Sequence, residues 1–330
     1  MARILLTQAI HPQAEQRLAV LGEVVTAPAT DPDTLRRSAA GCSVIVVRAP
    51  LPDDIFAAAP SIVGAVRHGA GVDMIPLEAA SAHGVLVANV PGVNAGTVAE
   101  HVLGQMVRLA RGAAAMAACV DDGSAAGWAR ARALADAGVD LGGRTLGVVG
   151  FGHVGQAIAR IAALGFGMQV LAHSRGGTSN AHAQAATLAE LLRRSDFVVL
   201  ACPLTAETRG LVGGAQLALM RRGTFLVNVA RGPVVDEAAM LDALRSGHLA
   251  GAALDVFDVQ PLPADHPLRA LRQVLITPHV AGITDDSMRR MGEGAARAVA
   301  CLLRGELPPH CVNPQALPAF LEHFRSATTR

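Results

Sequence analysis

The sequence predicts an α/β fold with two doubly wound parallel-sheet domains, one inserted into the other. Short β-branched runs alternate with amphipathic stretches through most of the 330 residues, a pattern typical of parallel strands joined by crossover helices. The runs are apolar throughout, as strands must be when helices cover both faces of their sheet. The length leaves room for two domains of roughly 100–200 residues each.

The first series of strand-like runs occupies the N-terminal quarter of the chain. Helix-like stretches lie between its members near residues 12–21, 33–40, 52–59 and 76–83. The runs are brief and bounded by turn residues, and they comprise Ile4–Leu6, Val24–Val25, Val44–Val47, Ile62–Val66 and Val85–Ala88.

A long helical stretch, Thr97–Cys119, separates this series from a second one, and a Gly- and Ala-rich segment around Trp128 follows the stretch. A further helix is expected at Thr284–Leu303, after the last strand. We therefore predict that residues 1–98 and 286–330 form one domain and that residues 99–285 form the inserted one. Strands of the second series are predicted near 145–150, 168–172, 197–201, 225–229, 250–256 and 274–277.

The composition excludes several classes of function. All 28 basic residues are Arg, and without Lys neither a Schiff base to pyridoxal phosphate nor a Lys-bearing phosphate loop can form. Tyr is also absent, so acid–base chemistry falls to the 12 His, the carboxylates or a Cys. The formal net charge of +1 lacks the basic excess of a nucleic-acid-binding protein.

Cysteine usage and the apolar segments point to the cytoplasm. The five Cys are odd in number, widely spaced and without a Cys-x-x-Cys motif, which favours reduced thiols. The N-terminal apolar run is too short for a signal peptide, and Ala113–Ala118 is too short for a membrane span. The His spacing matches no metal motif. We expect a cytoplasmic protein with no metal, membrane or nucleic-acid partner.

A glycine-rich motif, Gly150-Phe-Gly152-His153-Val154-Gly155, follows a predicted strand and opens a predicted helix. Gly150 permits the tight turn, Gly152 lets the backbone approach a pyrophosphate, and Gly155 lets helix and strand pack closely. The helix N-terminus adds N–H donors and a positive dipole end. An ordinary strand–helix turn is the alternative, but the context favours a dinucleotide site of the Rossmann type.

The end of the next strand bears on the choice of cofactor. An Asp or Glu usually lies there and binds the ribose hydroxyls of NAD, but this chain reads His173-Ser174-Arg175. Ser174 can donate a hydrogen bond to a 2′-phosphate, and Arg175 can bind it with its planar fork. We therefore expect NADP(H) to be preferred over NAD(H), unless Arg175 is merely a solvated loop residue.

Two further side chains follow predicted strands of the second series, and ligands bind at the carboxyl ends of such strands. Arg231, in Asn228–Asp236, is a fixed cation suited to a carboxylate and an adjacent carbonyl oxygen. His279, in Thr277–Gly282, can deliver or accept a proton near neutral pH. Taken singly, either residue could serve as an ion-pair or capping partner.

With these motifs the chain resembles the D-isomer-specific 2-hydroxyacid dehydrogenases, the family that includes phosphoglycerate dehydrogenase, hydroxypyruvate reductase and formate dehydrogenase. The resemblance extends to Arg67–Asp73, Val98–His101 and Cys202–Val212. It implies a Rossmann NAD(P) domain, residues 99–285, inserted into a flavodoxin-like substrate domain. It also implies a homodimer formed through the helix near 97–119.

The resemblance implies a role for each matched residue. Arg231 would bind the substrate carboxylate and polarise its carbonyl, and His279 would be the acid–base residue. Asp255 would hydrogen-bond the nicotinamide carboxamide. Backbone N–H groups of Gly69, Ala70 and Gly71 would help to hold the carboxylate. Further cofactor-lining positions are implied at Cys202, Pro203, Thr208 and Gly282 and at the backbone of Val229 and Ala230.

The chain departs from the family pattern at Gln260, where most relatives carry Glu. An amide oxygen can still orient the imidazole of His279, but it supplies no negative charge to stabilise the imidazolium. Carbonyl reduction is then expected to fade at a lower pH than in Glu-bearing relatives, unless Asp258 or Asp265 supplies a substitute charge. Formate dehydrogenases also carry Gln here, which leaves formate-type oxidation as an alternative.

The expected function is hydride transfer between NADP(H) or NAD(H) and a small D-2-hydroxy acid or 2-keto acid, similar to glyoxylate or hydroxypyruvate. A dinucleotide-sensing binding protein, like the corepressors of this fold, is the alternative from another class. Arg48 either contacts a second anionic group of the substrate or is simply solvated.

Overall fold

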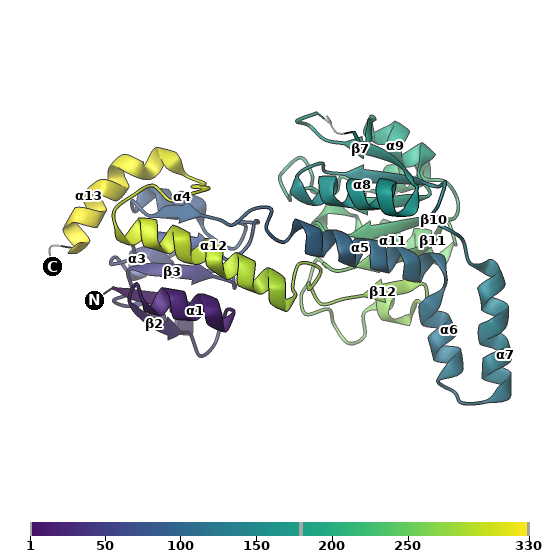
Figure 1. Cartoon of the computed structure of the whole chain (residues 1–330), viewed down its shortest axis with the longest axis horizontal. Helices are drawn as coiled ribbons and strands as arrows, with labels where there is room; N and C mark the ends of the chain where they lie inside the picture. The colour runs from purple at the N-terminus through teal and green to yellow at the C-terminus, as the bar shows by residue number, and fades with distance from the viewer. Residues whose placement is uncertain (1, 178–180, 329–330) are drawn as a thin grey trace. The chain divides into compact units, whose positions relative to one another are not determined.

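The computed structural model describes residues 2–177 and 181–328, which divide into two compact units. The first unit comprises the chain up to Asn94 together with the chain from Ile283 onward, and the second comprises Ala95–Gly282. The predicted junctions after residues 98 and 285 lie a few residues C-terminal to these divisions. Figure 1 shows each unit as a sheet with helices on both faces.

The first unit contains a five-stranded parallel sheet with the order β2-β1-β3-β4-β5. This is the flavodoxin-like order, and it confirms the fold class predicted for this part. One predicted strand is shifted, because Ile62 and Val63 precede β4 and do not belong to it. The strands are β1 (Arg3–Leu6), β2 (Glu23–Thr26), β3 (Val44–Val47), β4 (Gly64–Arg67) and β5 (Leu86–Ala88).

Helices cover the two faces of this sheet with separate apolar clusters. On one face, Ile4 and Leu6 pack with residues of α1, α12 and α13, and on the other Leu5 packs with residues of α2, α3 and α4, as the two-residue period of a strand requires. The predicted helix 52–59 shortens to the single turn α3. The helices are α1 (Pro12–Ala19), α2 (Pro32–Ala39), α3 (Ile55–Ala58), α4 (Leu77–Ala82), α12 (Asp285–Leu303), η4 (Pro314–Ala316) and α13 (Leu317–Thr328).

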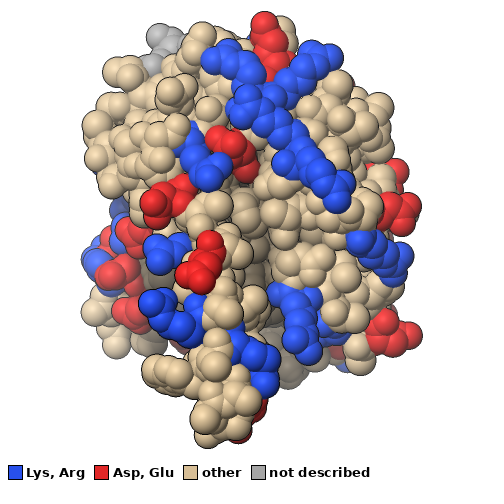
Figure 2. All heavy atoms as spheres, turned by 90° about the vertical axis from the view of Figure 1, so that its right-hand side faces the viewer, with Lys and Arg blue, Asp and Glu red and all other residues tan. Residues whose placement is uncertain are grey.

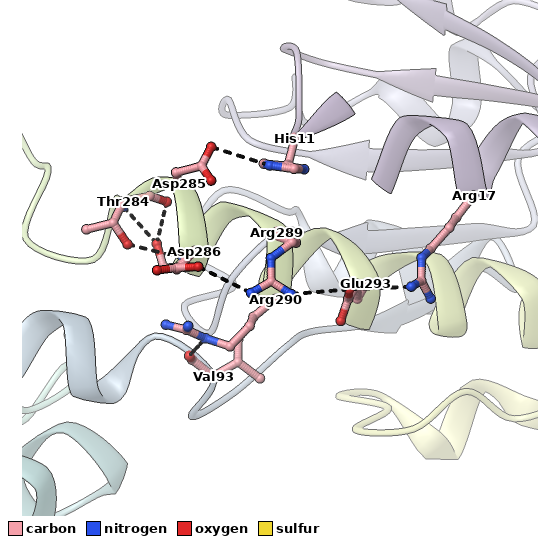
Figure 3. A network of polar contacts seen from close by, with 10 residues as sticks. His11, Arg17, Val93, Thr284, Asp285, Asp286, Arg289, Arg290 and Glu293 are labelled. Carbon is pink, nitrogen blue, oxygen red and sulfur yellow. Dashed lines mark hydrogen bonds and ion pairs between the residues drawn. The ribbon is translucent and has the colours of Figure 1, made fainter. Parts of the chain in front are cut away.

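Polar contacts fix the first turns of α12 within the first unit (Figure 3). Thr284 caps the helix, since its hydroxyl accepts the N–H of Ser287 at 3.1 Å. His11, at the start of α1, lies 3.4 Å from the carboxylate of Asp285. Arg290 donates to the carbonyl of Val93 at 3.0 Å. The His11 contact joins α12 to the start of α1, and the Arg290 contact joins it to the segment that follows β5, near the place where the chain leaves the unit.

The second unit contains a seven-stranded parallel sheet with the order β12-β11-β10-β9-β6-β7-β8. Counted from β6, this is the doubly wound 3-2-1-4-5-6 order with one strand added, which confirms the predicted class. The order reverses between β6 and β9, where such sheets bind ligands. The strands are β6 (Thr145–Val149), β7 (Gln169–His173), β8 (Gln184–Ala185), β9 (Phe197–Leu200), β10 (Thr224–Asn228), β11 (Leu249–Leu254) and β12 (Val274–Ile276).

Two apolar clusters again lie on the two faces of the sheet. One contains residues of α5 and α8, and the other contains residues of α9, α10 and α11. No described helix combines the length and the apolar character that a bilayer crossing requires. These helices are α5 (Ala95–Ala110), α8 (His153–Phe166), α9 (Leu188–Arg194), α10 (Gly214–Leu219), η2 (Gly232–Val234), α11 (Glu237–Arg245) and η3 (Pro267–Ala270).

The long helix predicted over 97–119 is wrong as a single element. The chain breaks at Gly112, which has a left-handed φ of 61° that interrupts a right-handed helix, and a second helix, α6 (Ala113–Val120), begins after it. The segment around Trp128 forms α7 (Ala125–Leu134), followed by η1 (Ala135–Ala137). Figure 1 shows α6 and α7 as a hairpin.

Candidate functional site

The glycine-rich motif forms a tight turn between β6 and α8. Gly150 has φ 95°, a conformation that favours glycine. A Cβ there would lie 2.5 Å from the backbone nitrogen of Cys202, and a Cβ on Gly155 would lie 2.1 Å from the carbonyl oxygen of Gly150. Glycine at these positions therefore permits close backbone packing.

Gly152 differs from the other two glycines, because a Cβ on it would meet nothing within 4 Å. It is the N-cap of α8, which begins at His153 and so three residues before the predicted Gln156. The open side of Gly152 at a helix N-terminus is the arrangement that a pyrophosphate requires. The imidazole of His153 is exposed, and Val154 packs against the apolar core.

A cavity of about 360 Å³ lies beside this turn. Its apolar wall includes Cys202, whose thiol pKa is raised by burial and which is therefore kept neutral. The side chains of Val229 and Ala230 pack against the apolar clusters, and neither residue lines this cavity. The implied contact of their backbone with the cofactor stays a prediction. The predicted cofactor residues that line the cavity are Gly150, Gly152, Ser174, Arg175, Cys202, Pro203 and Thr208.

The loop after β9 is ordered by Thr208. Its hydroxyl donates to the carbonyl of Pro203 at 2.7 Å and accepts the N–H of Thr205 at 2.7 Å. The adjacent Glu207 also lines the cavity, and the sequence analysis did not single it out. Its carboxylate lies 3.6 Å from the guanidinium of Arg175, so the cation predicted to bind a phosphate has a carboxylate partner.

Asn228, at the end of β10, holds the loop that carries Arg231. The Asn228 side chain is 2% exposed; its oxygen accepts the N–H of Ala230 at 3.0 Å, and its amide donates to the carbonyl of Arg231 at 3.0 Å. The guanidinium of Arg231 donates to the carbonyl of Ala230 at 2.7 Å. Asn228 thus fixes the backbone from which Arg231 projects, a role that the sequence analysis missed.

Asp255 organises the loop that carries His279. It is 2% exposed, and one carboxylate oxygen accepts the Thr277 hydroxyl at 2.6 Å and the Val280 N–H at 2.9 Å. The other oxygen accepts the Ala281 N–H at 2.9 Å. Three donors from one loop converge on this carboxylate, so Asp255 holds the loop in its conformation. Its contact with the nicotinamide carboxamide stays a prediction.

Backbone hydrogen bonds link these two loops. The N–H of Asp255 donates to the carbonyl of Asn228 at 3.1 Å, and the N–H of His279 donates to the carbonyl of Asp255 at 2.8 Å. The loops that carry Arg231 and His279 are therefore connected through a single buried residue at the carboxyl ends of β10 and β11.

His279 adopts a left-handed φ of 58°, which is uncommon for a residue with a Cβ. Its Nδ1 lies 3.3 Å from Oε1 of Gln260, while Nε2 of Gln260 donates to the carbonyl of Phe257 at 3.3 Å. A carbonyl only accepts, so the Phe257 contact fixes which end of the amide faces the imidazole. Nδ1 of His279 then carries a hydrogen, and Nε2 is the nitrogen that exchanges the second proton.

In the first unit, Arg67 stabilises the loop after β4 by hydrogen bonds to its backbone. Its guanidinium donates to the carbonyls of Gly71 at 2.9 Å and His68 at 2.6 Å. The N–H of Gly69 donates to the carbonyl of Arg67 at 2.9 Å in this structure, and its contact with a substrate carboxylate stays a prediction. Within the described part of the chain, no acceptor takes the N–H groups of Ala70 and Gly71.

Two other groups lie close to this loop. The guanidinium of Arg48 donates to the carbonyl of Ala9, and burial lowers its pKa, so Arg48 is not simply solvated. His68 is 3% exposed, and its Nε2 has no hydrogen-bond partner among the described residues. Burial, with contributions from Arg48 and Arg67, lowers the pKa of His68 to about 4.

Comparison with known proteins places these features in a family. A family model described as "D-isomer specific 2-hydroxyacid dehydrogenase, NAD binding domain" matches residues 103–281. A glyoxylate reductase of Korarchaeum cryptofilum is 37% identical over 273 residues, which are 81% of this chain and 81% of the relative.

A D-3-phosphoglycerate dehydrogenase of Methanocaldococcus jannaschii is 35% identical over 325 residues. The match covers 96% of this chain but only 60% of that relative's length. The crystal structure of an NADPH-dependent glyoxylate/hydroxypyruvate reductase of Sinorhizobium meliloti, in complex with NADP and malonate, superposes with a TM-score of 0.82. It is 28% identical, and the match covers 94% of this chain and 96% of that one.

Proposed function

The chain belongs to the D-isomer-specific 2-hydroxyacid dehydrogenases, and from this premise we propose that it is an oxidoreductase acting on a small 2-keto acid or D-2-hydroxy acid. A substrate of the glyoxylate or hydroxypyruvate kind agrees with the names of the reductases that it resembles. The observation that carries the proposal is the buried linkage of the Arg231 and His279 loops through Asp255.

Arg231 is the residue proposed to bind the substrate. A guanidinium presents parallel N–H donors to a carboxylate and stays charged at every relevant pH. It can therefore hold the acid and withdraw electrons from the adjacent carbonyl oxygen. The Asn228 side chain is hydrogen-bonded to the backbone of Ala230 and Arg231. Because the backbone that carries the guanidinium is held in place before the substrate arrives, less entropy is lost on binding.

His279 is the proposed acid–base residue. In the direction of reduction, its Nε2 gives a proton to the carbonyl oxygen, and in oxidation it takes that proton back. The contact from Nδ1 to Gln260 holds the ring and its tautomer. When bound, the nicotinamide supplies or accepts the hydride. In the first unit, the N–H groups of Ala70 and Gly71 are also suited to a carboxylate.

NADP(H) is the proposed preferred cofactor, with NAD(H) as the alternative. Ser174 and Arg175 both line the cavity beside the glycine-rich turn. An arginine there favours a 2′-phosphate, and the reductase of Sinorhizobium meliloti is named as NADPH-dependent.

A homodimer is the proposed assembly. None of the residues of α6 is buried, although all eight are apolar, and Trp128 on α7 is 67% exposed. This hairpin lies at the lower right of Figure 1, and the lowest part of the surface in Figure 2 is mostly uncharged. Exposed apolar surface of this kind favours association, and in a homodimer a second copy would cover it.

Loss of the reduced-nicotinamide absorbance with a panel of 2-keto acids tests the proposed function. Wild-type protein should consume NADPH with glyoxylate or hydroxypyruvate. Arg231→Lys keeps the charge but loses the planar fork, so kcat/KM should fall roughly 10²–10³-fold. Arg160→Lys, at an exposed position on α8, is the matched control and should not change. A flat trace with every acid and both cofactors would favour a binding protein over an enzyme.

A further inference from the structure

The cavity beside the glycine-rich turn contains an ion pair between two exposed side chains. Arg175 follows β7, and Glu207 belongs to the loop after β9, so the pair joins two neighbouring loops. Nη1 of Arg175 lies 3.6 Å from Oε2 of Glu207, and the side chains are 70% and 65% exposed. An incoming ligand can therefore reach both groups.

The carboxylate of Glu207 is held in its ionised form. The hydroxyl of Thr205 donates to Oε2 of Glu207 at 2.6 Å. This hydrogen bond lowers the pKa of Glu207, and the nearby charge of Arg175 lowers it further. Of the described residues that line the cavity, Glu207 alone carries a carboxyl group.

We propose that Glu207 is a specificity-determining residue that weakens the discrimination in favour of NADP(H). The inference rests on the proposed dinucleotide function of the cavity. A 2′-phosphate has to compete with the Glu207 carboxylate for Arg175, and it is repelled by the negative charge of that carboxylate. An unphosphorylated ribose meets no such opposition.

The same carboxylate also gives the cavity an acceptor for ribose hydroxyls. Sheets of this type usually place that acceptor at the end of the second strand, where this chain has Ser174 and Arg175 instead. Glu207 supplies a carboxylate from the opposite loop. The pair of Arg175 and Glu207 therefore provides one group for each form of the cofactor.

Calorimetric binding of two nucleotides that differ only in the 2′-phosphate tests this inference without any turnover. The probes are adenosine 2′,5′-bisphosphate and AMP. In Glu207→Gln, the bisphosphate should bind about tenfold more tightly at low salt, which corresponds to about 1.4 kcal/mol, while AMP should bind equally or less tightly. The gain should shrink at high salt, since exposed charges are screened.

Two further variants test whether the change in affinity comes from the Glu207 charge beside Arg175. Glu100→Gln removes the same charge from an exposed position on α5 in the same unit, and it should leave the affinity ratio of the two probes unchanged. In an Arg175→Gln background, Glu207→Gln should have a smaller effect, because the competition for the guanidinium is gone. An unchanged ratio in Glu207→Gln, or an equal change in Glu100→Gln, would overturn the inference.

The wild-type measurement separates this inference from the proposal on which it rests. If neither probe binds, the cavity is not a dinucleotide site, and both proposals are wrong. If AMP binds more tightly than the bisphosphate in the wild type and Glu207→Gln reverses that order, the proposed preference for NADP(H) is wrong, while the role of Glu207 is supported.

Discussion

Nδ1 of His279 and Oε1 of Gln260 lie 3.3 Å apart, and the carbonyl of Phe257 fixes the orientation of the Gln260 amide. The imidazole is thereby oriented by a neutral acceptor. A carboxylate in the same place would orient it equally well and would also stabilise the protonated ring. Replacing the neutral amide by a carboxylate should therefore change how the rate of reduction depends on pH.

Gln260→Glu should extend carbonyl reduction to higher pH. In the proposed mechanism, reduction requires the imidazolium of His279 as proton donor, and a neighbouring negative charge keeps that proton on the ring as the pH rises. A shift of one pH unit corresponds to about 1.4 kcal/mol. The measurement is kcat/KM against pH for the wild type and the variant. Gln260→Ala serves as the comparison, since it should lower the rate at every pH. An unmoved profile in Gln260→Glu would refute the charge argument.

Asp255→Asn should destabilise the second unit by about 2–3 kcal/mol, because loop N–H groups and the Thr277 hydroxyl would face an amide that accepts at one atom only. The loop that carries His279 should loosen, so kcat should fall more than KM rises. Urea unfolding and steady-state kinetics measure the two effects. Asp242→Asn, on α11 of the same unit, is the control. An unchanged free energy of unfolding would contradict the conclusion that Asp255 holds this loop.

Much of the fold was predictable from the sequence because burial on both faces of a sheet leaves β-branched runs. Val44–Val47 and Phe197–Leu200 are wholly buried, and both runs were predicted as strands. The break at Gly112 was not predicted, since apolar residues continue on both sides of it and give the appearance of a continuous helix. A single left-handed glycine decides between one helix and two.

The site was predictable only in part. Arg231, His279 and the glycine-rich turn follow strands directly, so their place at the carboxyl ends of the sheet could be inferred. Glu207 acts through a contact with Arg175 on another loop. Asn228 acts through side-chain hydrogen bonds to the backbone of Ala230 and Arg231 in its own loop, and the residue type alone does not specify either arrangement. The hydrogen bond from the Gly69 N–H to the carbonyl of Arg67 could not be predicted either, because it depends on the local turn.

Acidification should weaken the first unit through His68. Its pKa is lowered from 6.5 to about 4 in the folded state, so the unfolded chain binds more protons between these values, and stability falls as the pH drops from about 6.5 to about 4. The loss amounts to about 3 kcal/mol. His68→Gln should lose correspondingly less stability over this range in urea unfolding. His83→Gln, at an exposed position, should behave as the wild type; equal losses in both variants would contradict the prediction.

Trp128→Arg should shift the protein from dimer toward monomer. The indole is 67% exposed on the α6–α7 hairpin, and a charge in an apolar contact between two copies is costly to desolvate. Sedimentation velocity over a range of concentrations measures the assembly. Leu164→Arg, at an exposed apolar position on α8, is the comparison. A wild-type chain that sediments as a monomer at every concentration would rule out the homodimer.

Arg231 and His279 are proposed to serve a hydride transfer to the carbon beside a carboxylate. Reduction of hydroxypyruvate with NADPH that carries deuterium in place of both hydrogens at nicotinamide C4 tests this proposal most directly, with the product analysed by mass spectrometry and by its configuration. The expected product is D-glycerate with deuterium bound at C2. Product of the L configuration, deuterium absent from C2, or no product with either cofactor would contradict it.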